Sequence, residues 1–190
     1  MKNKPNQIIS PTIVDGTVTL PVKTATALLS LADKGGTRIH LADVRVIKGD
    51  GESVWLATTN GCAALYVRCD GSIALDKYTV LKVDAVKTAI AVAKATKSAT
   101  ASVAITQGET VAPSLWQVYP STRGASAASC GFDMKLLSSV ADAVELASPG
   151  NGGRVQFGAS VTDAVTVECP SGNVKALIMP MRLKGDEPRR

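Results

Sequence analysis

The sequence contains a single histidine and few aromatic residues, and it lacks the motifs of common enzyme classes. Aromatic side chains make up 4% of the 190 residues. Serine and cysteine nucleophiles usually need a histidine base, and His40 lies in the apolar alternation Arg38-Ile39-His40-Leu41, so we interpret it as structural. The carboxylates are scattered along the sequence. The two glycine-rich phosphate-binding motifs, G-x-x-x-x-G-K-[ST] and G-x-G-x-x-G after a strand, do not occur. These absences predict that the protein is not an enzyme, and an enzyme without a recognisable motif is the distant alternative.

The four cysteines, at positions 62, 69, 130 and 169, do not have the C-x-x-C spacing of zinc sites. We therefore predict no metal and no cofactor, and we expect the cysteines to be small buried apolar groups. Long hydrophobic runs are also missing, because none approaches the ~18 residues of a membrane span. The segment from Met1 to Ser10 has no apolar stretch of the signal-peptide kind, so we expect a cytoplasmic protein without a membrane partner.

The formal net charge is +5, and part of it lies at the two ends of the chain. Lys2 and Lys4 are the only charged residues among the first twelve, and the tail Lys184–Arg190 carries a net +1. The body between them keeps +2. Such a balance permits a nucleic-acid partner but does not require one.

Apolar residues at helical spacing predict three helices, over Val22–Asp33, Asp84–Thr96 and Met134–Ala147. Asp133 is the expected N-cap of the last helix. β-Branched residues, together with turn signals such as Asn60-Gly61, predict strands between and after the helices. The expected strands are Arg38–Lys48, Ser53–Thr58, Cys62–Cys69, Lys77–Val83, Thr100–Ile105, Ser114–Val118, Ala127–Phe132, Arg154–Phe157, Ala164–Cys169 and Val174–Met179.

These elements follow a loose rhythm, in which a short strand enters a helix and antiparallel strands follow. The rhythm starts near residues 18, 78 and 127, although the residues themselves are not closely repeated. It predicts an α+β fold in which helices pack on antiparallel sheets in about three half-domain units.

The helix expected over Asp84–Thr96 has lysines around its apolar stripe. Lys87 and Lys94 lie two turns apart beside the stripe, and Lys82 and Lys97 flank the two ends. Two interpretations stay open. The lysines form either an ordinary solvated flank or a surface that faces phosphates, where ammonium groups bind DNA without reading its sequence.

Three segments carry a resemblance. The first, near the C-terminus and after an apolar strand, is Met179-Pro180-Met181-Arg182-Leu183. The second is a predicted strand and turn, Leu56-Ala57-Thr58-Thr59-Asn60-Gly61. The third has two prolines seven residues apart, in Pro113-Ser114-Leu115-Trp116-Gln117-Val118-Tyr119-Pro120. In their order along the chain, these segments resemble parts of the bacterial β sliding clamp, the processivity subunit of DNA polymerase III. That family typically ends in Met-Pro-Met-Arg-Leu. At the turn, that family has Thr-Asp-Gly followed by His-Arg-Leu. Thr59-Asn60-Gly61 aligns with the first three residues, and Cys62-Ala63-Ala64 replaces His-Arg-Leu.

The resemblance implies that the chain has a DNA-clamp-like fold. It also implies a reduced form that lacks the clamp's N-terminal domain. Residues 18–120 would correspond to the middle domain, and residues 127–183 to the second half of the C-terminal domain. An N-terminal arm over residues 1–17, expected to be disordered, and a tail over residues 184–190 would flank them. Because the family's dimer contact uses the missing domain, we expect a homo-oligomer built differently, with an exposed sheet edge or apolar face.

In that family a hydrophobic pocket between the middle and last domains captures short peptides from polymerases and other DNA-handling proteins. Carried over by position, the resemblance implies a peptide pocket formed by Thr59, Gly61, Pro113, Val118, Met179, Pro180, Met181 and Leu183. Methionine side chains adapt to varied apolar ligands, which suits such a pocket. The plainer interpretation is that Leu177, Met179 and Met181 are ordinary strand and core residues.

The resemblance therefore predicts a DNA replication accessory protein without catalysis, and its small size suggests a phage or mobile-element origin. It would bind double-stranded DNA non-specifically through Lys82, Lys87, Lys94 and Lys97, and it would recruit DNA polymerase or other replication proteins. The alternative is a clamp-derived module that binds such peptides and regulates or diverts replication proteins without encircling DNA. The small charge of the body favours this alternative.

Overall fold

The computed structural model describes residues 10–33, 39–49, 52–75, 78–108, 131–150, 152–158 and 163–181. Its helices are α1 (Val22–Ser30), α2 (Ile39–Ala42), α3 (Val83–Ala95) and α5 (Met134–Ala147). Its strands are β1 (Thr12–Val14), β2 (Thr17–Pro21), β3 (Val44–Lys48), β4 (Val54–Thr59), β5 (Ala63–Cys69), β6 (Thr79–Leu81), β7 (Thr100–Ala104), β8 (Thr106–Gln107), β9 (Arg154–Gln156), β10 (Val165–Glu168) and β11 (Val174–Ile178).

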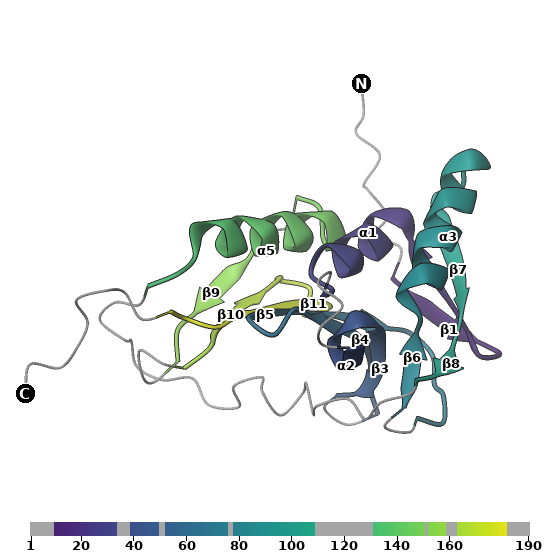
Figure 1. The fold of residues 1–190 in the computed structure, drawn as a ribbon, viewed down its shortest axis with the longest axis horizontal. Helices are drawn as coiled ribbons and strands as arrows, with labels where there is room; N and C mark the ends of the chain where they lie inside the picture. Colours follow the sequence, from purple (N-terminus) through teal and green to yellow (C-terminus); the bar gives the residue numbers. More distant parts are fainter. Residues whose placement is uncertain are drawn as a thin grey trace, which may run out of the picture.

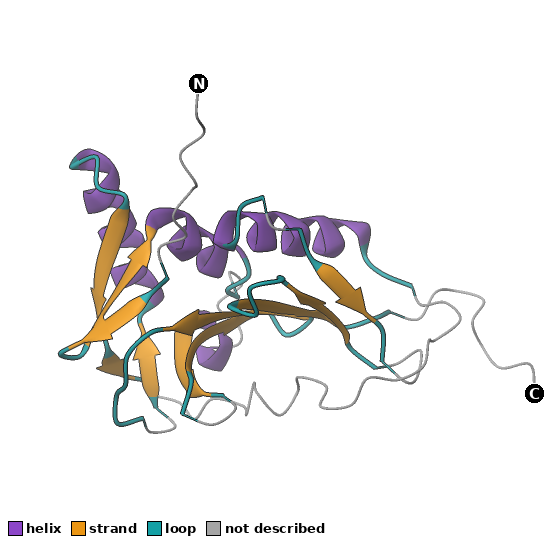
Figure 2. Cartoon of the chain, turned by 180° about the vertical axis from the view of Figure 1, so that it is seen from behind, coloured by secondary structure: helices purple, strands orange, loops and turns teal. Residues whose placement is uncertain are grey.

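The strands form two antiparallel sheets. One has eight strands in the order β8-β6-β3-β4-β5-β11-β10-β9, and the other has three in the order β1-β2-β7. Helices α1 and α5 lie along one side of the large sheet, and α3 stands beside β7 at one end of the molecule (Figure 1). The view from behind shows the same layering (Figure 2). The α+β prediction, with helices packed on antiparallel sheets, is confirmed.

The main apolar core joins the early and late parts of the chain. Strand β11 pairs with β5 from Val174 opposite Val67 to Ile178 opposite Ala63, so the C-terminal strands extend the sheet begun by the first part. Helix α1 packs against both α3 and α5. Leu28 of α1 and Val140 of α5 are both buried in this core. The three predicted helices are therefore brought together around α1.

Local chemistry explains where several elements begin and end. The Asp133 side chain accepts hydrogen bonds from the backbone N–H groups of Lys135 and Leu136, at 2.8 and 3.2 Å, and caps α5 as predicted. Asp15 and Gly16 have positive φ angles of 47° and 70°, which suits the tight turn between β1 and β2. This Asp-Gly hairpin was not among the predicted elements.

Two predicted boundaries are wrong. The strand expected over Arg38–Lys48 begins only at Val44, because Ile39–Ala42 forms the short helix α2. The N-terminal arm expected over residues 1–17 ends earlier, because Thr12–Val14 pairs with β2. The strand expected over Ser114–Val118, and most of the one over Ala127–Phe132, lie outside the described residues. The domain boundaries at residues 18–120 and 127–183 stay a prediction.

The expectation of buried cysteines holds for two of them. Cys69 and Cys169 are buried, and burial raises the pKa of both thiols, that of Cys69 to about 12. Cys62 is exposed, because it lies in the turn between β4 and β5 rather than within a strand. Cys130 lies outside the described residues.

Candidate functional site

The candidate site starts at the turn between β4 and β5, which its own side chains hold in shape. The Asn60 side-chain oxygen accepts from the backbone N–H groups of Cys62 and Ala63, at 3.0 and 2.9 Å. The Thr59 hydroxyl donates to the carbonyl of Ala63 at 2.6 Å and accepts from the N–H of Gly61 at 3.0 Å. Gly61 has a φ of 88°, which favours glycine. Thr59 is buried beneath the turn, whereas Gly61 is exposed at its surface.

The end of β11 lies directly against this turn. The backbone N–H of Met179 donates to the carbonyl of Cys62 at 2.9 Å, which extends the β5–β11 ladder beyond its last strand pair. Residues more than 100 positions apart in sequence are thus adjacent. The N–H of Met181 donates to the carbonyl of Gly131 at 2.9 Å, which adds the segment that precedes α5. Met179, Pro180 and Met181 therefore lie between two other parts of the chain.

The two methionines are only partly covered. Met179 is 39% exposed and Met181 is 46% exposed, whereas Leu177 and Ile178 just before them are buried. Flexible thioether side chains with half their surface in water offer an adaptable apolar contact. The plainer interpretation, in which Leu177, Met179 and Met181 are ordinary strand and core residues, fits the buried Leu177 but does not fit the exposed fractions of the two methionines.

A second apolar cluster lies on the face of the large sheet that is opposite to the main core. Trp55, Ala57, Ala64, Tyr66, Ala164 and Leu177 form it, separately from the main core. Side chains alternate along a strand, so Met179 follows Leu177 on the same face. The Lys175 ammonium lies 5.4 Å from the centre of the Trp55 ring on this face. Sequence reasoning missed this cluster, although β4 reads as a continuous apolar run of the kind that is buried on both faces.

The remaining predicted pocket residues cannot be placed beside these. Pro113, Val118 and Leu183 lie outside the described residues. The structure thus brings together Thr59, Gly61, Met179, Pro180 and Met181, which come from two of the three resembling segments. The exposed Cys62 joins them through its carbonyl.

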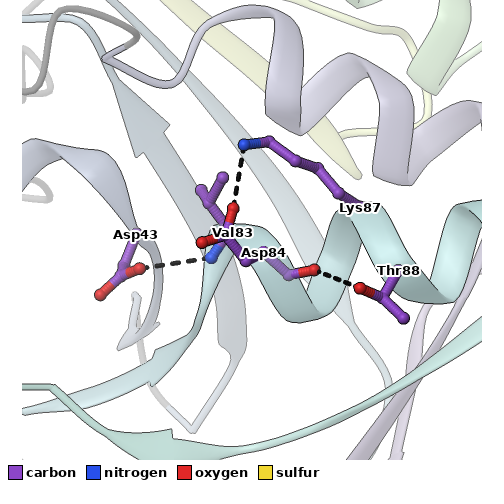
Figure 3. Close-up of polar contacts among 5 residues, drawn as sticks. All are labelled: Asp43, Val83, Asp84, Lys87 and Thr88. Atoms are coloured by element: carbon purple, nitrogen blue, oxygen red, sulfur yellow. Dashed lines mark hydrogen bonds and ion pairs between the residues drawn. The ribbon is translucent and has the colours of Figure 1, made fainter.

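The four lysines predicted to bind DNA cluster around α3, but two of them have carboxylate partners. Lys82 lies 2.9 Å from Asp43, and Asp43 also accepts from the backbone N–H of Val83 at the start of α3. Lys87 lies 3.0 Å from Asp84 on the same helix (Figure 3). In the described part of the chain, no ion pair involves Lys94 or Lys97. The four lysines are therefore not equally free to contact phosphates.

A search of the described ranges finds no group of three or more His, Cys, Asp or Glu residues that could hold a metal ion. Among the same residues, no helix has the length and apolar character needed to cross a membrane.

Comparison with known proteins identifies the fold. No protein-family model and no curated protein sequence matches the chain. Among solved structures, it matches DNA polymerase III subunit beta from Thermotoga maritima with a TM-score of 0.62 at 11% identity, over 96% of this chain and 70% of that one. The corresponding subunit from Borrelia burgdorferi, in complex with a natural product, gives 0.61 at 11% identity, over 90% and 66%. That from Streptococcus pneumoniae gives 0.62 at 10%, over 96% and 69%.

The chain therefore has the fold of bacterial sliding clamps, and it spans about two thirds of the length of these solved structures. The resemblance found in three short segments is confirmed at the level of the fold.

Proposed function

We propose that this chain is a clamp-like accessory protein of DNA replication, without catalysis, that recruits partners by binding short peptides at the junction of the β4–β5 turn and the end of β11. One observation carries this proposal. The Met179–Cys62 hydrogen bond, at 2.9 Å, joins the C-terminal resembling segment to the residue that directly follows the Leu56–Gly61 segment, and Met179 and Met181 are 39% and 46% exposed. The proposed protein acts in the cytoplasm.

The junction suits an apolar peptide side chain. Full burial of a methionine side chain is worth about 1.5–3 kcal/mol. Met181 still has 46% of its surface in water, so a peptide that covered it would gain about 1 kcal/mol from this residue. That free energy corresponds to roughly a fivefold change in Kd.

Fluorescence anisotropy of a labelled peptide with a clamp-binding motif tests this site. The wild type should bind saturably in roughly the micromolar range. Met181→Ala should raise Kd about fivefold, and Met179→Ala combined with it should raise Kd further. Val14→Ala is the matched control, because Val14 is an exposed apolar residue on β1, which is not part of the junction. No binding by the wild type, or an equal loss in the control, would contradict the site.

Non-specific binding of double-stranded DNA is the second part of the proposal. It rests on the lysines around α3 and on the clamp fold, since the solved relatives are subunits of DNA polymerase III. Such binding should weaken steeply as salt increases and should ignore base sequence. Assembly of more than one chain would be needed to surround a duplex.

The alternative function is peptide binding without DNA. It is favoured by the two lysines that already pair with Asp43 and Asp84. Under this alternative the peptide would bind as above, whereas a labelled duplex would show no salt-sensitive binding.

A further inference from the structure

The chain has four methionines, and the three in the described part of the structure all lie at the surface. Met134, at the start of α5, is 72% exposed, more than either Met179 or Met181. The buried apolar side chains of the described residues are instead leucine, isoleucine, valine, alanine, and a few aromatic residues and cysteines. Methionine is one of the residue types most often buried in proteins, so its restriction to the surface is a distinctive feature of this chain.

Two of these methionines emerge where β11 leaves the core. Leu177 and Ile178 are buried, whereas Met179 and Met181, on either side of Pro180, are exposed. Their backbone positions do not depend on their side chains, because the N–H groups of both donate hydrogen bonds of 2.9 Å to backbone carbonyls. The chemistry of the two thioethers can therefore change while the backbone of the junction stays in place.

The chemistry open to an exposed thioether is oxidation by a peroxide. The sulfur takes one oxygen atom and becomes a sulfoxide, the O–O bond of the peroxide breaks, and hydrogen peroxide leaves as water. Two electrons pass from the sulfur to the peroxide. Methionine sulfoxide reductases reverse the step, with electrons from thiols, and the oxygen leaves as water. The reaction converts a flexible apolar side chain into a polar one.

We infer that Met179 and Met181 form a reversible oxidation site that switches peptide recruitment off, a role that rests on the function proposed for the junction. The side chains that offer apolar contact to a peptide are the same ones that a peroxide reaches. A sulfoxide oxygen covered by an apolar peptide side chain loses its hydrogen bonds to water without replacement, and such burial is unfavourable. Oxidation therefore weakens the bound state and leaves the free chain folded.

The cysteines of the described residues do not offer a competing switch in the core. Cys69 and Cys169 are buried, and burial raises the pKa of both thiols, so both stay in the less reactive protonated form. Cys62 is exposed and also reacts with a peroxide. It holds Met179 through its backbone carbonyl, so Cys62→Ser removes the thiol and keeps that hydrogen bond.

The test compares peptide binding before and after oxidation of the full chain with the Cys62→Ser substitution. The chain is treated with hydrogen peroxide, the peroxide is removed, and a dithiol returns other oxidised cysteines to thiols. A labelled clamp-binding peptide without methionine is then titrated by fluorescence anisotropy, and mass spectrometry of a digest shows which methionines carry an added oxygen. Oxidation should raise Kd at least about tenfold, and methionine sulfoxide reductases should restore the original Kd.

Two leucine variants in the same background separate the junction from the other methionines. Leucine has nearly the volume of methionine and no sulfur, so it keeps an apolar contact and cannot be oxidised in this way. Met179→Leu/Met181→Leu should bind the peptide with the same Kd before and after treatment, although Met134 is still oxidised. Met134→Leu is the matched control, and treatment should raise its Kd as it does for the background protein. Thermal melts should change little on treatment, because no described methionine lies in the core.

Three results would overturn the inference alone. These are an unchanged Kd when Met179 and Met181 are fully oxidised, an equal loss of affinity in the treated double leucine variant, and a loss of affinity that accompanies unfolding of the treated chain. Absence of peptide binding before treatment would overturn both the recruitment site and the inference. The untreated and treated titrations therefore distinguish the failure of the proposed function from the failure of the switch.

Discussion

The ion pairs around α3 lead to a quantitative prediction about DNA binding. Lys82 and Lys87 each have a carboxylate within 3.0 Å, whereas Lys94 and Lys97 have no ion pair within the described residues. A lysine whose charge is already balanced by a carboxylate releases fewer counterions on contacting a phosphate. The two free lysines should therefore account for most of the salt dependence of binding.

The magnitude follows from counterion release. Each phosphate neutralised contributes about −0.9 to the slope of log K against log salt. Two effective lysines give a slope of about −2 for each bound chain, and four would give about −4. Asp43 has only 16% of its side chain exposed, so its pairing with Lys82 is the more persistent of the two.

Fluorescence anisotropy of a labelled duplex, titrated at several salt concentrations, measures this slope. The variants Lys94→Ala/Lys97→Ala and Lys82→Ala/Lys87→Ala remove the same charge, and only the first should remove most of the slope. Asp84→Asn should free Lys87 and steepen the slope by about one. Equal effects of the two double variants would refute the reasoning.

Two further predictions concern the core. Leu28→Ala should lower the free energy of unfolding by about 2–5 kcal/mol, because Leu28 is fully buried in the main core. Leu29 is only partly buried on the same helix, so Leu29→Ala should lower it less, and urea denaturation measures both. Burial raises the pKa of Cys69 from its ordinary 9.0 to about 12, so the folded chain keeps a proton that the unfolded chain loses above pH 9. Stability should therefore fall as pH rises from 9 toward 12, and thermal melts of Cys69→Ala should show a smaller decline.

Much of the fold could be predicted because its signals are local. The three helices carry apolar stripes, and Asp133 caps α5 through its own side chain as its position predicts. The Asn60-Gly61 hairpin forms because both residues have the chemistry that a tight turn needs. The prediction of a strand over Arg38–Lys48 is confirmed for Val44–Lys48 and wrong for its start. The alternating residues there are also compatible with one turn of helix, and short apolar runs do not separate the two.

The site could be predicted only in part, because its formation depends on pairing between distant strands. Nothing in the local sequence of Met179 shows that its backbone N–H reaches Cys62. The resemblance to the sliding clamp is what predicted that the two segments lie together. The exposed thiol of Cys62 was missed because cysteine is usually buried. The edge positions of β7 and β9 among the described strands are likewise properties of the assembled sheets. They fit the expectation of an exposed edge, which itself came from the resemblance.

The rate at which iodoacetamide modifies Cys62 tests the recruitment site most directly, because this exposed thiol lies at the junction itself. Mass spectrometry separates it from Cys69 and Cys169, which are buried and should stay unmodified in the folded chain. With a clamp-binding peptide at about ten times its Kd, roughly nine tenths of the chains are occupied, so modification of Cys62 should slow about tenfold. An unchanged rate in the presence of a peptide that anisotropy shows to be bound would place the peptide elsewhere and contradict the account.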